Sequence, residues 1–456
     1  MKRCARHFLL AAAIAVVVSG CGAGGGDGAS GAGAPDSGGS ASGGGPASAG
    51  ASPATGSGSG GGTSPVPTAQ AFSAFDPVLI GSSTSSFHPP ATARLAGGGN
   101  AVLWIQGTQL MARLTDAGGA PTGAAFVVSA GQTRTPFTFS VAPADDGGFI
   151  VAWIFETIPP QSQFHAVTAV QAKRFTAAGD TLWEARVNEG LFHGINGPVV
   201  KATADGFVVG WSSKLVLTAP DQVFLQRLSA DGERIGGQVA LGDTTAQSQT
   251  NLSVAPLQDG SVLAVWRQRS FPEDIYSIYT RRLSADLAPL APPTRLAGTG
   301  SPGAFFVDAE TLSNGNAALA WGATADSGSS EVRSAVLAPD GSFASAVHAT
   351  PAEAMVTGVA VLPFGDTGFG VVSQILRTGP QFVNASLQLQ RFRPSGAPLD
   401  ALGELVVRQT FRADPDTGVV LDAGTGFDIA GGPDGHVVAA FKRVDQTQAN
   451  AYLMGR

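Results

Sequence analysis

The chain has 456 residues, of which 13% are charged and 43% hydrophobic, and 62 of them are glycine. Basic residues number 27 and acidic residues 34, so the formal net charge is −7. Such a chain repels phosphate backbones at long range, which argues against a nucleic-acid partner. Its two cysteines, Cys4 and Cys21, precede the region expected to fold. A disulfide or a thiolate metal site within that region is therefore excluded.

The first twenty residues have the organisation of a secretory signal peptide. Lys2, Arg3 and Arg6 precede an apolar stretch, residues 8–18, that is too short to cross a bilayer. The stretch ends in Val18-Ser-Gly-Cys21, which resembles the lipobox of bacterial lipoproteins. The resemblance implies cleavage before Cys21 and lipid on its thiol, which would anchor the protein stably in a membrane. An ordinary signal peptide that happens to contain a cysteine is the alternative.

Two features after the lipobox bear on location. Gly22 stands where the common inner-membrane retention signal of that family has aspartate, so the outer membrane is favoured over the inner one. Which side of the outer membrane the protein occupies stays open. Residues 21–70 form a lipidated, Gly/Ser/Ala-rich linker that lacks the apolar residues needed to fold. The sequence thus predicts a signal peptide at 1–20, a flexible linker at 21–70 and a folded domain at 71–456.

The folded region repeats one pattern, in which a turn glycine precedes a short apolar strand with a bulky residue at its end. Seven copies place at that end Trp104, Trp153, Trp211, Trp266, Trp321, Ser373 and Phe441. A period near fifty residues built from strands is typical of small sheets repeated around an axis, because one unit cannot bury its own apolar face. We therefore expect the tryptophans at a repeated core position rather than on a sugar-binding surface.

Each copy predicts four strands joined by two short turns and one longer loop. In the third copy these are residues 198–203, 207–211, 223–228 and 237–241, and Asp205-Gly206 is expected to form a two-residue hairpin. The last copy stops after three strands, whereas residues 72–82 resemble the missing fourth. We therefore predict an all-β, seven-bladed β-propeller closed by an N-terminal strand. A ring of six or eight blades, or a pair of β-sandwiches, is the alternative.

The second copy contains the clearest family resemblance. Residues 146–153, with the sequence DGGFIVAW, and 171–175, QAKRF, resemble a degenerate propeller repeat of secreted bacterial proteins, DGGFxVxW followed by QRF. The resemblance implies a propeller and no particular activity.

No catalytic or metal-binding motif stands out, and no cofactor is predicted. Residues 176–183 partly resemble the Asp-box turn of sialidases, but Ala178 stands where that motif has aspartate. The histidines after residue 20 lack metal-ligand spacing. Paired carboxylates for glycoside cleavage cannot be identified from spacing alone.

The variable connections offer a candidate binding face. Loops between the second and third strands, and between successive copies, differ in length and fall on one face of a propeller, where binding residues usually lie. Aromatic and arginine residues are enriched at such surfaces. The candidates are Phe155, Phe164, His165, Phe192, His193, Arg267, Arg269, Phe271, Tyr276, Arg377 and Phe382.

Three functional hypotheses remain, and the third is a structural envelope protein whose propeller merely adds surface bulk. The favoured one is a non-catalytic, membrane-anchored envelope lipoprotein that binds a protein or glycan partner of the envelope through this face. The alternative is a propeller-fold hydrolase or lyase acting on polysaccharide. Converging Asp or Glu side chains at the axis would favour the enzyme, and an axis lined by apolar and small residues would favour the binder.

Overall fold

The computed structural model describes the repeat region with short gaps. The described residues are 78–83, 89–129, 138–157, 167–190, 193–215, 219–242, 248–270, 275–296, 298–300, 305–325, 327–352, 354–378, 382–399, 403–412, 427–431, 437–445 and 448–455. All of them belong to one compact unit, Pro67–Arg456. The predicted signal peptide, Cys21 and the linker lie outside the described residues. In the described part of the chain no helix is long and apolar enough to cross a membrane.

The described strands form seven antiparallel four-stranded sheets, which we number in chain order. Sheet 1 consists of β2 (Ala91–Arg94), β3 (Asn100–Gln106), β4 (Gln109–Thr115) and β5 (Phe126–Val127). Sheet 2 consists of β6 (Phe139–Pro143), β7 (Phe149–Thr157), β8 (Val167–Phe175) and β9 (Thr181–Arg186). Sheet 3 consists of β10 (His193–Thr203), β11 (Gly206–Lys214), β12 (Gln222–Ser229) and β13 (Arg234–Ala240). Sheet 4 consists of β14 (Ser248–Pro256), β15 (Val262–Ser270), β16 (Ile275–Leu283) and β17 (Thr294–Arg295).

The remaining sheets continue the pattern. Sheet 5 consists of β18 (Phe305–Thr311), β19 (Ala317–Thr324), β20 (Ser330–Leu337) and β21 (His348–Pro351). Sheet 6 consists of β22 (Met355–Pro363), β23 (Phe369–Thr378), β24 (Phe382–Phe392) and β25 (Gly403–Arg412), with the 3-10 turn η1 (Gly365–Thr367) between β22 and β23. Sheet 7 consists of β26 (Phe427–Gly431), β27 (Val437–Asp445), β28 (Gln448–Gly455) and the N-terminal strand β1 (Val78–Ser83).

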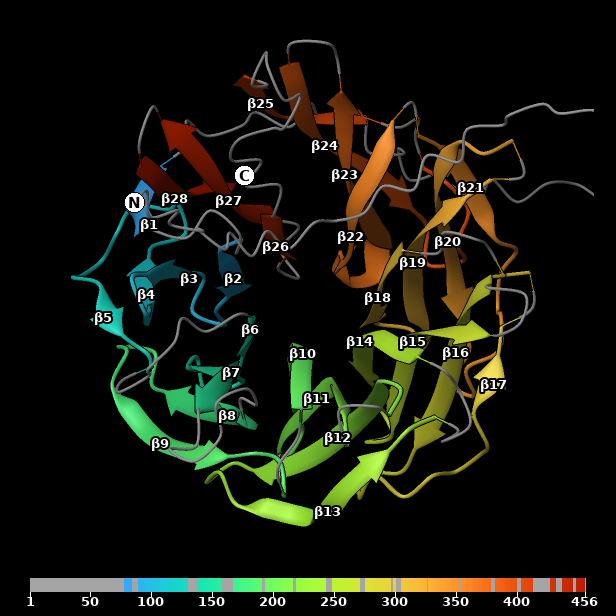
Figure 1. Ribbon diagram of the computed structural model, residues 1–456, viewed down its shortest axis with the longest axis horizontal. Helices are drawn as coiled ribbons and strands as arrows, with labels where there is room; N and C mark the ends of the chain where they lie inside the picture. Colours follow the sequence, from blue (N-terminus) through green and yellow to red (C-terminus); the bar gives the residue numbers. More distant parts are fainter. Residues whose placement is uncertain are drawn as a thin grey trace, which may run out of the picture. The chain divides into compact units, whose positions relative to one another are not determined.

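The sheets surround a common axis with the first strand of each repeat innermost (Figure 1). β2, β6, β10, β14, β18, β22 and β26 each contact the inner strand of the next sheet, and β26 contacts β2, so the circle is closed. The all-β class and the propeller architecture predicted from the sequence are therefore confirmed. The closing strand is also where the sequence placed it, because β1 pairs with β28 through Val78 opposite Leu453 and Leu79 opposite Tyr452.

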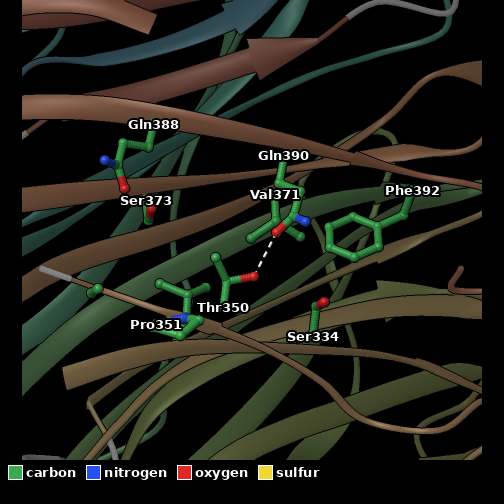
Figure 2. A pocket seen from close by; sticks show the side chains of 10 residues that line it. Ser334, Thr350, Pro351, Val371, Ser373, Gln388, Gln390 and Phe392 are labelled. Carbon is green, nitrogen blue, oxygen red and sulfur yellow. Dashed lines mark hydrogen bonds between the residues drawn. The ribbon is translucent and has the colours of Figure 1, made fainter. Parts of the chain in front are cut away.

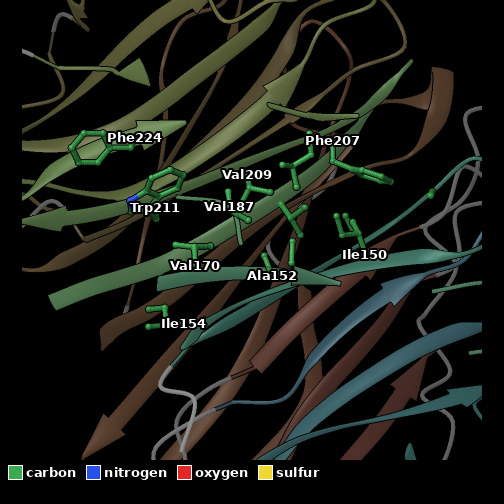
Figure 3. Packing of buried hydrophobic residues seen from close by; sticks show 14 residues of the cluster. Ile150, Ala152, Ile154, Val170, Val187, Phe207, Val209, Trp211 and Phe224 are labelled. Carbon is green, nitrogen blue, oxygen red and sulfur yellow. The ribbon is translucent and has the colours of Figure 1, made fainter. Parts of the chain in front are cut away.

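The repeated tryptophan fills the space between neighbouring sheets. Trp211 of sheet 3 is fully buried and belongs to one apolar cluster with Ile150, Ala152 and Ile154 of sheet 2 (Figure 3). Its ring also stacks on Phe224, with centroids 5.8 Å apart. Trp104, Trp153, Trp266 and Trp321 occupy the same position, each packing toward the preceding sheet. The expectation that these residues belong to the core is confirmed.

The turn between the first and second strands differs from the expected two-residue hairpin in most sheets. In sheet 1, Gly98 N donates to Leu95 O and Leu95 N donates to Gly99 O, and Gly98 has a φ of 84°. This is a three-residue loop that ends in a left-handed glycine, a combination compatible with strand twist. Among the described turns between a first and a second strand, the turn of sheet 3 is the shorter one. Thr203 pairs with Gly206, so the two loop residues are Ala204 and Asp205 rather than the expected Asp205 and Gly206.

The basic residue of the repeat has a structural role at these turns. Arg174 Nη2 lies 2.6 Å from Asp146 Oδ1, and Arg227 pairs with Asp205 in the next sheet. Arg282 pairs with Asp259 in the same way in sheet 4. Each arginine comes from a third strand and reaches the turn between the first two strands. The basic residue of the third strand therefore stabilises the turn in sheets 2, 3 and 4.

Candidate functional site

Four polar side chains close the inner edges of the sheets. An innermost strand has a single neighbour within its sheet, so the N–H groups on its unpaired edge need other partners. Four of them are capped by a side chain of the preceding sheet. The pairs are Val200 N to Ser140 Oγ (3.4 Å), Ala309 N to Ser253 Oγ (3.0 Å), Val361 N to Asp308 Oδ2 (2.8 Å) and Thr92 N to Asp428 Oδ2 (2.7 Å).

The four capping residues occupy one register position. Each is paired with the residue directly before the bulky residue of its second strand. The pairs are Ser140 with Ala152, Ser253 with Val265, Asp308 with Ala320, and Asp428 with Ala440. They therefore form a belt at one height around the axis.

β-bulges adjust two members of this belt. The register of β14 shifts between Thr250 and Ser253, and that of β18 shifts between Phe305 and Val307. The inserted residues Asn251 and Phe306 have φ values of 53° and 47°. A left-handed backbone is strained for phenylalanine, and bulges with such strain are common beside functional sites because they re-aim the following side chains. In both strands the next belt residue, Ser253 or Asp308, follows within two positions.

Asp308 is held by three hydrogen bonds. Its Oδ1 accepts from Ser253 Oγ at 2.9 Å and from Ala309 N at 3.0 Å, and its Oδ2 accepts from Val361 N. The donors belong to sheets 4, 5 and 6. Both carboxylate oxygens therefore have fixed positions at the axis.

An ion pair joins two sheets that are not neighbours. Lys201 of β10 and Glu310 of β18 lie two residues beyond the belt position and are joined through Nζ and Oε1. Sheet 4 lies between their sheets in the ring, so the pair directly connects two sheets that are not adjacent, near the axis. Each side chain remains 23% exposed. The axis thus carries the side chains of Lys201, Asp308, Glu310 and Asp428, which we call the axial cluster.

Burial of the carboxyl groups and their mutual repulsion raise the pKa values of Asp428 and Glu310 in the axial cluster. Burial raises the pKa of Asp428 to about 6, opposed by hydrogen bonds from the Thr92 and Ile429 N–H groups, and the charge of Asp308 raises it further. Burial also raises the pKa of Glu310, and the charge of Lys201 opposes that rise. Burial lowers the pKa of Lys201, but the charges of Glu310 and Asp308 outweigh it, so that this pKa is raised.

The need to cap a backbone N–H group does not by itself explain why positions 308 and 428 carry carboxyl groups. Ser140 and Ser253 cap the same backbone position with a neutral hydroxyl. Aspartate at the equivalent positions 308 and 428 adds the cost of taking charge away from water. Titratable groups with perturbed pKa values gathered at one point are a signature of functional sites. The arrangement offers a proton donor near neutral pH, Asp428, beside an oriented acceptor, Asp308.

The residues predicted for the binding face are distributed over several sheets. Arg267, Arg269 and Tyr276 come together, with the two guanidinium carbons 4.4 and 5.6 Å from the centre of the tyrosine ring. Phe155 lies on β7, partly buried, and His193 begins β10 opposite Lys214. Arg377 lies on β23 opposite Asn384, and Phe382 lies on β24 opposite Arg412. Phe164, His165, Phe192 and Phe271 lie outside the described residues.

The sequence did not single out the axial cluster. Its members lie on the first strands, whereas the search for binding residues followed the loops. A signal was available, because aligning the first strands on the tryptophan register places Asp308 and Asp428 in one column and Lys201 and Glu310 in another. Among the described residues no group of three or more His, Cys, Asp or Glu side chains is arranged to hold a metal ion.

A second polar feature lies between sheets 5 and 6, where Ser373 takes the tryptophan position (Figure 2). The space open to the centre of a water molecule there is about 10 Å³, and the lining includes Ser334, Thr350, Gln388 and Gln390. Thr350 Oγ1 donates to Gln390 Oε1 at 2.5 Å, and Ser334 Oγ has no hydrogen-bond partner among the described residues. That volume is about enough for one water molecule and too small for a substrate.

Comparison with known proteins identifies no family for this chain. No family model and no curated protein matches the sequence. Among solved structures, an α-L-arabinanase of Penicillium chrysogenum is 13% identical, with a TM-score of 0.44 over 84% of this chain and 98% of that one. A Dyadobacter fermentans protein of unknown function is 10% identical, with a TM-score of 0.43 over 83% and 97%. A Hadza microbial sialidase is 12% identical, with a TM-score of 0.40 over 72% and 68%. Likenesses this distant carry no inference about activity.

Proposed function

We propose that this protein is a propeller-fold hydrolase that cleaves glycosidic bonds of a polysaccharide at the axial cluster. The observation that carries the proposal is the convergence of Asp308, Glu310 and Asp428 at the axis, with the pKa of Asp428 raised to about 6. Glycoside hydrolysis commonly needs two carboxyl groups in different protonation states, one to protonate the leaving oxygen and one to accept a proton or attack carbon. The axial cluster supplies Asp428, whose pKa is raised, and Asp308, whose carboxylate is oriented by three hydrogen bonds. We therefore reverse the sequence-based preference for a non-catalytic binder.

Each carboxyl group has a role in this proposal. Asp428 donates the proton to the glycosidic oxygen, because a pKa of about 6 leaves a substantial protonated fraction near neutral pH. Asp308, oriented by Ser253 and Val361, acts as the base or nucleophile. Glu310 and Lys201 form the ion pair beside them and stabilise the charges that change during the reaction. Lyase chemistry is the alternative, and it would leave an unsaturated sugar at the new chain end.

The test is a screen of the purified protein against a panel of polysaccharides, with reducing ends and unsaturated sugars measured separately. Asp428→Asn should lower kcat by about 10²- to 10⁴-fold on any substrate found, the usual contribution of a general acid. Asp259→Asn is a matched control, because it makes the same substitution at an aspartate that Ser261 and Arg282 hold in the turn between β14 and β15. Full activity of Asp428→Asn would contradict the proposed roles, and absence of cleavage across the panel would contradict the proposed function.

The cluster of Arg267, Arg269 and Tyr276 supports a second candidate, a non-catalytic module that binds a protein or glycan. Arginine and tyrosine are enriched at binding hot spots, and these side chains are partly exposed at one end of β15 and β16. Retention of an envelope glycan or protein without any cleavage product would favour this candidate over the hydrolase.

We also propose that the protein is a lipoprotein anchored through Cys21 in the outer membrane, with the linker at 21–70 and a seven-bladed ring at 71–456. The lipobox, the composition of the linker and the seven sheets support this organisation. Mass spectrometry of the mature N-terminus should find acylated Cys21, and Cys21→Ser should release the protein from the membrane fraction. An unmodified mature N-terminus would contradict the anchor.

A further inference from the structure

One kind of bulge recurs in the innermost strands of three successive sheets. In sheets 3, 4 and 5 the ladder register shifts because one residue is inserted just before the residue that faces the tryptophan of the second strand. The inserted residues are Gly197, Asn251 and Phe306, with φ values of 53°, 53° and 47°. All three therefore have a left-handed backbone at one register position, on the variable-connection side of the belt.

Phenylalanine is the most strained of these three residues in that backbone. A left-handed φ suits glycine, and asparagine also adopts it, because its short polar side chain can form local hydrogen bonds. A bulky side chain is crowded by the following carbonyl group. Sheets 3 and 4 use the two tolerant residues, whereas sheet 5 places an aromatic ring there. Strain of this kind is typical of positions that hold a ligand.

The inserted position leaves the side chain of Phe306 available to a ligand. Phe306 is 37% exposed, whereas Ala309 on the same strand is completely buried. The equivalent position of sheet 3 also lies in the open, because a Cβ on Gly197 would meet no atom within 4 Å. An inserted residue is outside the ladder, so its side chain is not needed in the seam between sheets, where the tryptophans pack.

Strand β18 places this ring beside the axial cluster. Asp308 follows Phe306 by two residues and Glu310 follows it by four, on the same strand. At about 3.3 Å per residue, Phe306 lies within roughly 7 Å of Asp308 along the strand. Asp308 is itself oriented by Ser253 and by the Val361 N–H. One strand therefore sets the distance between an exposed aromatic ring and a fixed carboxylate.

A sugar ring matches the chemistry of these two groups. One face of the ring carries C–H groups and is apolar, while its hydroxyl groups form hydrogen bonds. The face of a phenyl ring is negatively polarised and attracts such C–H groups, and covering it removes apolar surface from water. A carboxylate accepts hydrogen bonds from the hydroxyl groups of the same sugar or its neighbour.

We propose that Phe306 is the sugar-stacking platform of the axial site, on which one ring of the substrate lies while Asp308 meets the adjoining glycosidic bond. The inference rests on the proposed function for its identification of the ligand as a substrate. The ligand is a glycan whose rings have one face free of bulky or charged substituents. Phe306 binds and positions the sugar and takes no part in proton transfer.

The test measures binding separately from cleavage. Neutral hexasaccharides of glucose, xylose, arabinose and N-acetylglucosamine are titrated calorimetrically into full-length Asp428→Asn protein. At least one should bind, and adding Phe306→Ala should weaken that binding by about 5- to 20-fold, the effect of losing the apolar surface that the exposed part of one phenylalanine offers. Phe306→Trp should retain the binding because it keeps a flat ring, whereas Phe306→Leu should weaken it as much as Phe306→Ala.

Two further measurements separate the platform from folding and from general apolar surface. Phe306→Gly and Phe306→Ala both remove the ring, but only glycine relieves the left-handed backbone, so the unfolding midpoint of Phe306→Gly should be higher by about 1–2 °C. Leu182→Ala removes an exposed apolar side chain from β9, the outermost strand of sheet 2, and should leave binding unchanged.

The platform would be overturned by no binding of any hexasaccharide, by equal binding with and without Phe306→Ala, or by equal losses in Phe306→Ala and Leu182→Ala. A midpoint of Phe306→Gly no higher than that of Phe306→Ala would remove the strain on which the inference depends. Cleavage by the wild-type protein with an unchanged KM in Phe306→Ala would contradict the platform and leave the proposed function. If sugars bind through Phe306 but the wild-type protein cleaves none of them, the proposed function fails and the platform stands.

Discussion

Replacing Asp428 with asparagine should stabilise the folded protein while removing its activity. Burial raises the pKa of Asp428 from the ordinary aspartate value of 3.8 to about 6, a difference of about 2. At about 1.4 kcal/mol per unit, the ionised carboxylate costs the folded state up to about 3 kcal/mol. Because Asp428 is partly exposed, this figure is an upper limit. Asparagine cannot ionise and still offers an oxygen to the Thr92 N–H.

The sign of the pH dependence follows from the direction of the shift. The folded protein keeps a proton on Asp428 at pH values where the unfolded chain has lost it, so stability falls as pH rises from about 4 to about 6. Asp428→Asn should therefore equal the wild-type protein near pH 3.5 and exceed it by up to about 3 kcal/mol at pH 7. For a unit of about 390 residues, Pro67–Arg456, that corresponds to a rise in the unfolding midpoint of roughly 4 °C.

Paired thermal or denaturant unfolding curves of the two proteins between pH 3.5 and 7.5 provide the assay. Taking the difference between the proteins at each pH cancels the titration of all other groups. A difference that is constant with pH, or one that grows toward acid, would refute the argument. Unchanged activity with increased stability would mean that the burial of Asp428 is real but serves no catalysis.

The other predictions concern the framework. Asp259→Asn should have the opposite sign: the Ser261 hydroxyl and N–H and then Arg282 lower the pKa of this largely exposed carboxyl, so neutral-pH stability should drop by less than about 1 kcal/mol. That loss should shrink only as pH falls below 3.8 and through the lower folded-state pKa, in an unfolding series extended to more acidic pH. Trp266→Ala should cost about 3–5 kcal/mol in denaturant titration, because the indole is completely buried between sheets 3 and 4, and Ser373→Ala at the equivalent position should cost about 1 kcal/mol or less. Deleting residues 22–84 should lower the unfolding midpoint and promote aggregation by exposing the edge of β28, whereas deleting residues 22–66 should not; equal behaviour of the two deletions in light scattering would count against closure by β1.

The strands and their order could be predicted because the information is local. A turn glycine and an apolar run recur in each copy, with a bulky end residue in all but the sixth, and the structure places Trp153, Trp211 and Trp266 at one equivalent buried position. The closing strand was predictable for a related reason, since a last copy with three strands requires a fourth from elsewhere. The exact turns were harder to predict, because a left-handed glycine serves both two-residue and three-residue hairpins.

The axial cluster depends on distances that no local pattern encodes. Lys201 and Glu310 are separated by 109 positions and meet only because two sheets lie on either side of a third. Asp428 meets the Thr92 N–H only because the circle closes. The bulges before Ser253 and Asp308 add a further obstacle, because one extra residue changes which side chain reaches the belt. Arg267, Arg269 and Tyr276 were easier to find, since they lie on the two strands of one hairpin, close to the variable connection between them.

The pairing of β1 with β28 determines the side from which the chain enters the ring. Val78 lies opposite Leu453, so β1 starts where β28 ends. In every other sheet the connection from the third strand to the fourth lies at this end, which is the side of the short turns. Val78, the first described residue of the ring, therefore lies on the side of the short turns, and the connection between β15 and β16 belongs to the opposite side. The closing strand and the variable connections thus lie on different sides of the ring, so a change in one leaves the other side of the scaffold in place.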